Sequence, residues 1–194
     1  VFTQLYPDEV AALVFIDCTH PQQVERANAA PKASFRYKAF VNTFHALAVV
    51  GDLGVVGLYD HFFGPVLPLD GLPNEVNGRI RNFFINGKLI RGKVKETENY
   101  HATLKRAGKT KNFGSLPIRV FTAVGINKEA YRAQGIDPEQ YLANRIQLQK
   151  EFTQLSTNGK QILIEGTHNS IYTKKENAAV INQEILQLLE VLKQ

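Results

Sequence analysis

The sequence is poor in cysteine and has no long hydrophobic run, and each of these absences excludes a class of protein. Its single cysteine, Cys18, cannot form an internal disulfide or a multi-cysteine metal site. Most of its histidines are scattered without the spacing of metal ligands, so we expect no metal and no cofactor. No apolar run approaches the roughly 18 residues that cross a bilayer, and no signal-peptide pattern is visible, so we expect no membrane span. The scattered histidines are His20, His45, His61 and His101.

A large excess of one charge is also lacking. The 194 residues are 44% hydrophobic and 21% charged, as in an ordinary globular domain with a sizeable core. The net charge of +5 comes largely from dispersed basic residues between Arg79 and Lys111, where Glu96 and Glu98 are interspersed. Nucleic-acid surfaces need denser basic clusters with interleaved aromatic residues. We therefore expect a solvated helical face here and no nucleic-acid partner.

Three short apolar runs predict the strands of a sheet. Residues 10–16, VAALVFI, form a nearly unbroken apolar run, which is typical of a parallel strand buried on both faces. Residues 118–124 and 161–164 are similar runs. Strands that alternate with helices indicate a parallel sheet with right-handed crossovers, so we predict the α/β class. One helix should begin with Asp137 as its N-cap and Pro138 in its first position. The predicted helices are 1–6, 24–37, 38–50, 75–85, 88–107, 137–155 and 176–193.

No strand is predicted between the first and second of these runs. We therefore divide the chain into a core, residues 1–21 and 115–194, and a helical insertion, residues 22–114. Most aromatic side chains of the insertion are expected to pack internally, and some are expected to line an apolar pocket that faces the strand ends. The residues of the insertion that we place nearest a substrate are His61, Phe62 and Phe63.

Two polar side chains follow predicted strands directly. Asp17 stands at the end of the first strand, and His168 lies just past the third. In open α/β sheets, ligands bind outside the carboxyl ends of the strands. A histidine at this place suits a general base because imidazole titrates near neutrality; the alternative is a histidine that only satisfies a polar loop. His20, in the loop after Asp17, is expected to border the same pocket.

Three blocks of the sequence resemble, in their order and spacing, the C-terminal portion of α/β-hydrolase-fold enzymes. The family's sixth strand, together with the segment that joins it to the nucleophile elbow, is matched here by YPDEVAALVFIDCTHP. The seventh strand is similar to LPIRVFTAVG, and the eighth strand, the histidine loop and the final helix resemble STNGKQILIEGTHNSIYTKKENAAVINQEILQLL. The helical insertion is similar to the cap domain that many members carry. The resemblance implies a parallel-sheet hydrolase fold with a helical cap, in which His168 is the catalytic histidine.

The resemblance also implies that the nucleophile lies outside this chain. The elbow places its nucleophile in a glycine-x-serine-x-glycine turn, and this pattern does not occur here. Cys18 lacks the elbow glycines, and its acidic neighbour disfavours a thiolate. Val1 is not methionine, and we expect the elbow and the oxyanion hole in upstream residues. The N-terminal half of the same protein is then a partner of this chain, and a nicked protein whose halves stay bound is one form of this. The serines of this chain all lie outside a glycine-x-serine-x-glycine pattern, and they are Ser34, Ser115, Ser156 and Ser170.

The acid that orients His168 has two candidates. Asp17 is the first choice, because some members of the fold place their acid after this strand. The usual position follows the second strand, where residues 125–128 offer no acid and Glu129 comes next. The acid must accept a hydrogen bond from the imidazole and stabilise the imidazolium. An ordinary turn aspartate is the alternative role for Asp17.

The resemblance therefore predicts a hydrolase of the esterase type. Its partner would be a small, fairly apolar ester or amide-like molecule, cleaved by a nucleophile, usually serine, with His168 and Asp17. An aspartate nucleophile would instead give dehalogenase or epoxide-hydrolase chemistry. A third alternative is a non-catalytic protein of the same fold that uses the capped pocket to bind a ligand.

Overall fold

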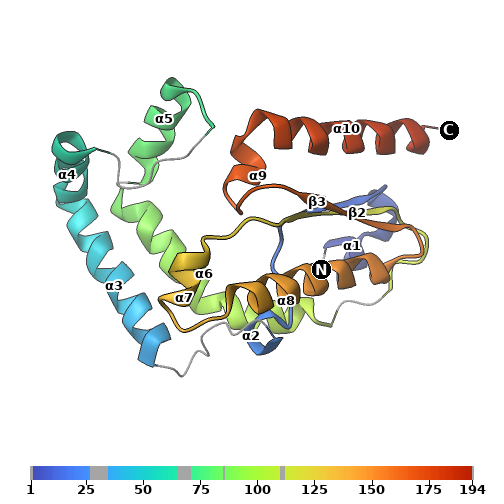
Figure 1. Ribbon diagram of the computed structural model, residues 1–194, viewed down its shortest axis with the longest axis horizontal. Coiled ribbons are helices and arrows are strands. Elements are labelled where there is room, and N and C mark those ends of the chain that lie inside the picture. The colour runs from blue at the N-terminus through green and yellow to red at the C-terminus, as the bar shows by residue number, and fades with distance from the viewer. Residues whose placement is uncertain (1, 27–34, 65–70, 85, 110–111, 194) are drawn as a thin grey trace. The chain divides into compact units, whose positions relative to one another are not determined.

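The chain divides into two compact units in the computed structural model (Figure 1). One unit comprises Val1–Ala29 and Leu104–Gln194, and the other comprises Ala30–Thr103. The second unit is therefore shorter at both ends than the predicted insertion, 22–114. The residues that the structure describes are 2–26, 35–64, 71–84, 86–109 and 112–193.

The first unit contains a sheet of three parallel strands. These are β1 (Leu13–Ile16), β2 (Ile118–Ala123) and β3 (Gly159–Ile164), in the order β1-β2-β3. Ile118 lies opposite the first residue of each neighbouring strand. The prediction of an α/β chain with a parallel sheet is thus confirmed for these strands. Their carboxyl ends lie at the same edge of the sheet, so the residues that follow them can meet there.

One face of the sheet packs against the C-terminal helices α9 (Ser170–Thr173) and α10 (Lys175–Leu192), which lie above the sheet in Figure 1. Because side chains alternate along a strand, every second residue of β2 contributes to this face. The buried cluster on this face consists of Phe121, Ala123, Ile164, Ile171 and Ile181.

The opposite face packs against α8 (Pro138–Glu151) and the 3-10 helix η2 (Phe152–Leu155), below the sheet in Figure 1. The predicted start of α8 is confirmed: Asp137 is the N-cap, and its side chain accepts hydrogen bonds from two backbone N–H groups of the first turn. Helices α9 and α10 therefore lie on one face of the sheet, and α8 with η2 lies on the other. The buried cluster on this face consists of Ile118, Val120 and Phe152.

The outer strands are shorter or more exposed than the sequence predicts. We expected 10–16 to be buried on both faces, but β1 begins only at Leu13 and leaves Val14 37% exposed. In β3, Leu163 is 54% exposed. The reason is position in the sheet: within the described residues both strands are edges, and only β2 has a neighbour on each side.

The second unit is helical, as predicted, but one helix boundary is wrong. We expected a break between residues 37 and 38, whereas α3 runs without interruption from Phe35 to Asp52. A side-chain ion pair between Asp52 and Arg91 links α3 to α6 (Gly87–Ala107). Residues 27–34, which include part of the predicted helix 24–37, lie outside the described residues. The remaining helices of the chain are α1 (Phe2–Leu5), η1 (Pro7–Glu9), α2 (Gln23–Arg26), α4 (Val55–Phe63), α5 (Asn74–Phe84), α6 (Gly87–Ala107) and α7 (Lys128–Arg132).

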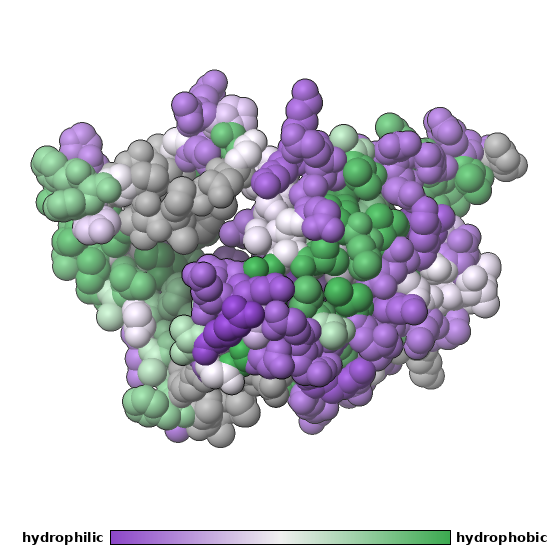
Figure 2. All heavy atoms as spheres, viewed as in Figure 1, coloured by the Kyte–Doolittle hydropathy of each residue, from purple (hydrophilic) through white to green (hydrophobic). Residues whose placement is uncertain are grey.

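Aromatic side chains of the second unit are mostly exposed, and this overturns the expectation that they pack internally. Phe35 is 85% exposed and Phe83 is 67% exposed. Figure 2 shows apolar residues gathered on the surface of α3 and α4. The helix spacing is as predicted, but no described element of this unit covers the apolar stripe of α4. This stripe consists of Val55, Leu58, Tyr59, Phe62 and Phe63, each between 49 and 75% exposed.

No single helix in the described part of the chain is both long and apolar enough to cross a membrane. Helices α3 and α4 reach the necessary length and hydropathy only when taken together, and they are bent by 79° with respect to each other.

Candidate catalytic site

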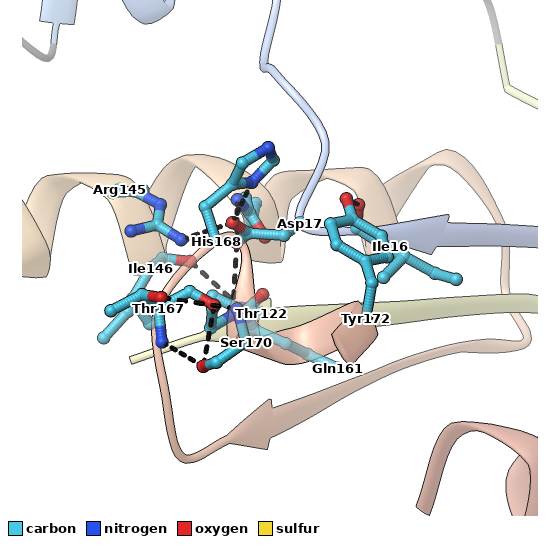
Figure 3. Close-up of polar contacts among 12 residues, drawn as sticks. Ile16, Asp17, Thr122, Arg145, Ile146, Gln161, Thr167, His168, Ser170 and Tyr172 are labelled. Atoms are coloured by element: carbon cyan, nitrogen blue, oxygen red, sulfur yellow. Dashed lines mark hydrogen bonds and ion pairs between the residues drawn. The ribbon is translucent and has the colours of Figure 1, made fainter. Parts of the chain in front are cut away.

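Asp17 and His168 lie side by side at the carboxyl edge of the sheet, although 151 positions separate them in the chain. The Nδ1 atom of His168 is 2.7 Å from Oδ2 of Asp17 (Figure 3). Asp17 bends across the end of β2, where its N–H donates to the carbonyl of Phe121 at 2.7 Å. Its Oδ1 accepts the N–H of Ala123 at 3.1 Å. The carboxylate is thereby brought over the central strand, within reach of the loop after β3.

The backbone of Asp17 adopts a left-handed conformation, with φ at 45°. Residues with a Cβ seldom adopt this conformation, which costs on the order of 1–3 kcal/mol. The two backbone hydrogen bonds to β2 and the buried side-chain contacts offset this cost. Strain of this kind concentrates at functional sites, and here it turns a carboxylate towards a histidine instead of into solvent.

Helix α8 supplies two further contacts to the carboxylate. The Nη2 atom of Arg145 lies 2.5 Å from Oδ1 and 2.6 Å from Oδ2 of Asp17. The Nε2 atom of Gln149 donates to Oδ1 at 3.0 Å. The side chains of Asp17 and Arg145 are only 2% and 10% exposed. Arg145 and Gln149 are four residues apart, so both project from the buried face of α8.

This environment fixes the charge of Asp17. Burial alone would raise the pKa of its carboxyl group, because an anion is poorly solvated there. The hydrogen bonds from His168 and Arg145, together with the charge of Arg145, outweigh burial and hold the pKa well below its usual range. Asp17 is therefore ionised at neutral and mildly acidic pH.

The same shift predicts how stability depends on pH. The pKa of Asp17 is lower in the folded than in the unfolded chain, where it is about 3.9. The ionised carboxylate therefore contributes its full share to the free energy of unfolding above about pH 3.9, and this share is lost as the pH falls towards the pKa of the folded state. Each pKa unit corresponds to about 1.4 kcal/mol. We expect urea unfolding to show this loss below about pH 4 in the wild type, and to lack it in Asp17→Asn. An identical slope in both proteins would contradict the assignment.

Hydrogen bonds within the chain hold the His168 loop in place. The N–H of Thr167 donates to Oγ of Ser170 at 2.7 Å, and the Ser170 hydroxyl donates to the carbonyl of Thr167 at 3.2 Å. Asn177, on α10, donates to the carbonyls of Glu165 and Ser170 at 2.9 and 3.0 Å. His168 therefore stands on a fixed turn and not on a free loop.

Two glycines allow the loops after β2 and β3 to approach each other. The N–H of Gly125 donates to the carbonyl of Gly166 at 2.6 Å, and a Cβ on Gly125 would lie 2.7 Å from the backbone of Gly166. Gly166 has φ at 121°, and a Cβ there would lie 2.2 Å from Oγ of Ser170. The close approach of these two loops therefore requires glycine at both positions.

Gly166→Ala is accordingly expected to lower the free energy of unfolding by about 2–4 kcal/mol, since backbone strain and the clash with Ser170 add. Gly135→Ala is the matched control, because Gly135 also has positive φ (73°) but has open space where the Cβ would lie. It should cost about 1 kcal/mol. Chemical denaturation of both variants measures the difference, and equal losses would show that the clash is absent.

The ring of His168 is held on one side and open on the other. Its side chain is 62% exposed. An ionised carboxylate can only accept, so Nδ1 carries the proton of the neutral ring and Nε2 is left with a free lone pair. Nε2 points away from Asp17 (Figure 3) and has no hydrogen-bond partner among the described residues. The Tyr172 ring lies edge-on at 5.6 Å, anchored by a 3.0 Å bond from its hydroxyl to the carbonyl of Ile16.

The other predicted site residues occupy different positions. Glu129, the alternative acid, is exposed on α7. Burial raises the pKa of the Cys18 thiol to about 12, and the nearby charge of Asp17 acts in the same direction, so this thiol is a poor nucleophile. His20 lines an open cavity of about 780 Å³ beside β1, where its ring packs against Phe152 at 5.0 Å.

The three candidates from the insertion, His61, Phe62 and Phe63, lie on α4 of the second unit. The rings of His61 and Phe62 contact each other edge-on at 5.1 Å, and Phe62 and Phe63 are exposed. The structure thus brings together Asp17 and His168 within the first unit, while the role of these three residues stays a prediction.

Sequence reasoning missed Arg145 and Gln149. The available signal was their position in α8: residues 138, 145 and 148–149 fall on one face at helical spacing, and this face is buried. An arginine in such a stripe needs a buried anion, and Asp17 was already a candidate. Among the residues that the structure describes, no cluster of His, Cys, Asp and Glu side chains could hold a metal ion.

No family model, curated protein sequence or solved structure matches this chain. The resemblance to α/β-hydrolase-fold enzymes therefore stays a prediction.

Proposed function

We propose that this chain provides the general base and the orienting acid of a hydrolase that uses a nucleophile, a histidine and an acid. The observation that carries the proposal is the 2.7 Å contact between His168 Nδ1 and the buried, ionised Asp17, with Nε2 open to approach. This pair stands at the carboxyl edge of a parallel sheet, where α/β proteins bind their ligands.

The contacts assign a role to each group. Nε2 of His168 accepts the proton of the attacking hydroxyl and later gives it to the leaving group. The Asp17 carboxylate holds the ring in the tautomer with a proton on Nδ1, and its charge stabilises the imidazolium that forms. The substrate proposed is a small, fairly apolar ester or amide-like molecule, and the proposed cap is the helical second unit.

The proposed nucleophile, usually serine in such enzymes, belongs to residues outside this chain. Two candidates within it are unsuitable. Cys18 is held as a thiol by burial, and the hydroxyl of Ser170 is engaged with Thr167. Among the described strands, β1 pairs on one side only, and this unpaired edge supports a further segment of the same protein beside it, because an apolar edge strand is a template for strand pairing.

The proposal is tested by covalent labelling of the protein in the form that includes the proposed upstream residues. A fluorophosphonate that mimics an acyl substrate is expected to label one serine upstream of Val1, and peptide mapping identifies it. An aspartate nucleophile would instead incorporate ¹⁸O from labelled water into its carboxylate during single turnover, giving dehalogenase or epoxide-hydrolase chemistry. A protein that undergoes neither reaction and hydrolyses no activated ester is a binding protein, and the proposal is then wrong.

A further inference from the structure

Arg145 is a buried cation, and among the described residues one anion lies within ion-pair distance of it. It lies in the middle of α8 and is 8% exposed. Within the described residues, its ion pair is with Asp17 alone. The desolvation cost of a buried ion pair commonly offsets its attraction, so such a pair adds little to stability compared with apolar packing. The burial of Arg145 therefore points to a role beyond holding α8 to the sheet.

The contacts of Arg145 restrict the orientation of the Asp17 carboxylate. One nitrogen bridges both carboxylate oxygens, at 2.5 and 2.6 Å. Oδ1 also accepts from Gln149 and from the N–H of Ala123, whereas the partners of Oδ2 among the described residues are the arginine and His168. Rotation of the carboxylate about its Cβ–Cγ bond would break the contacts at Oδ1. The one direction left for Oδ2 is towards Nδ1 of His168.

Gln149 shows that this arrangement is maintained at a cost. Its side chain is 2% exposed, and its Oε1 atom has no hydrogen-bond partner among the described residues. An unpaired buried acceptor costs about 1–3 kcal/mol. Turning the amide over would bring Oε1 against the Asp17 carboxylate, where two acceptors would repel each other. The donation to Asp17 therefore decides the orientation of this amide.

We propose that Arg145, supported by Gln149, is a positioning residue that acts through Asp17 to set the tautomer of His168. By keeping the carboxylate fixed as an acceptor, it keeps the proton of the neutral imidazole on Nδ1 and leaves Nε2 free. Its meaning for catalysis rests on the proposed function, but the tautomer is a property of this chain alone.

The tautomer can be read directly by NMR. Long-range ¹H–¹⁵N correlation of the imidazole, at a pH where the ring is neutral, distinguishes the nitrogen that carries the proton from the one that does not. We expect a protonated Nδ1 in the wild type. Arg145→Gln should lose at least roughly half of this population to the form with a proton on Nε2, and Arg145→Lys, which retains the cation, should restore it.

The matched control is Arg26→Gln. Arg26 forms a bidentate ion pair with Glu151 at the end of the same helix, at 2.7 and 2.8 Å, so its loss also removes an arginine that anchors α8. The tautomer of His168 should not change in this variant. A folded Arg145→Gln protein with an unchanged tautomer would reduce Arg145 to a structural ion pair and overturn the proposal.

If Arg145→Gln does not fold, Gln149→Leu decides. This variant retains the cation and removes the unpaired Oε1, so it should fold, and it removes one donor that fixes Oδ1. A measurable loss of the proton on Nδ1 supports the proposal, and no loss overturns it. These NMR measurements do not involve turnover, so a protein that proves inactive would refute the proposed function without changing the result for the tautomer.

Discussion

His168→Ala is expected to lower turnover of an activated ester by about four orders of magnitude or more in the protein that includes the nucleophile. Without the imidazole, no group in the described site can take the proton from the attacking hydroxyl. The fold should survive, because the side chain is 62% exposed and contributes mainly its bond to Asp17. Steady-state kinetics gives the loss, and circular dichroism with urea unfolding checks the fold.

The control for this experiment is His45→Ala. His45 is exposed on α3 of the second unit and lies 3.4 Å from Glu98, so its removal changes the histidine content and leaves the described contacts of Asp17 and His168 unchanged. Turnover should be unchanged in this variant. Full activity in His168→Ala would remove His168 from the mechanism.

Asp17→Asn is expected to reduce kcat by about 10⁴, the size of effect seen when serine proteases lose the corresponding acid. The reason lies in the hydrogen bonds. Where Asp17 only accepts, an asparagine can present its NH₂ group to Nδ1 of His168, which then becomes the acceptor and leaves the proton on Nε2. A ring in that form cannot act as the base. The left-handed backbone is no obstacle, since asparagine adopts it readily.

The same variant should also be less stable, because it leaves Arg145 buried without its anion. Breaking one half of a buried ion pair costs about 3–5 kcal/mol. The double variant Asp17→Asn/Arg145→Gln separates the two effects: it removes both charges, so part of the stability should return while activity stays low. Urea unfolding and steady-state kinetics of the wild type, the single variant and the double variant measure the stability and the activity separately.

Glu129→Gln is the matched control for the acid. Glu129 is exposed on α7, so this variant should retain both activity and stability. If Glu129→Gln loses activity and Asp17→Asn does not, the acid is Glu129 and the geometry around Asp17 serves only the fold.

The sequence was most informative about the strand ends. Parallel strands place their carboxyl ends at one edge, so Asp17 and His168 could be expected at the same place without knowledge of the packing. Hydrophobic runs found all three strands, and local capping chemistry found the start of α8 at Asp137. These features depend on neighbours along the chain or on a simple period of side chains.

The remaining features depend on contacts between distant residues. Arg145 meets Asp17 across 128 positions, and no local pattern specifies that pair. The left-handed backbone at Asp17 is imposed by its bonds to β2. The exposure of β1 and of the α4 stripe reflects which surfaces the described elements cover, whereas hydrophobicity only indicates that a surface favours burial.

The buried contact between Asp17 and Arg145 also restricts how this site can evolve. Moving the acid to a position beyond β2, for example to Glu129 on α7, would require the loss of Asp17, and that single step leaves the Arg145 cation buried without its anion. Replacing Arg145 first would instead leave the Asp17 carboxylate buried without its cation. Each path passes through a destabilised intermediate, so the two positions are epistatic. We therefore expect that proteins descended from this one have exchanged both residues together or neither.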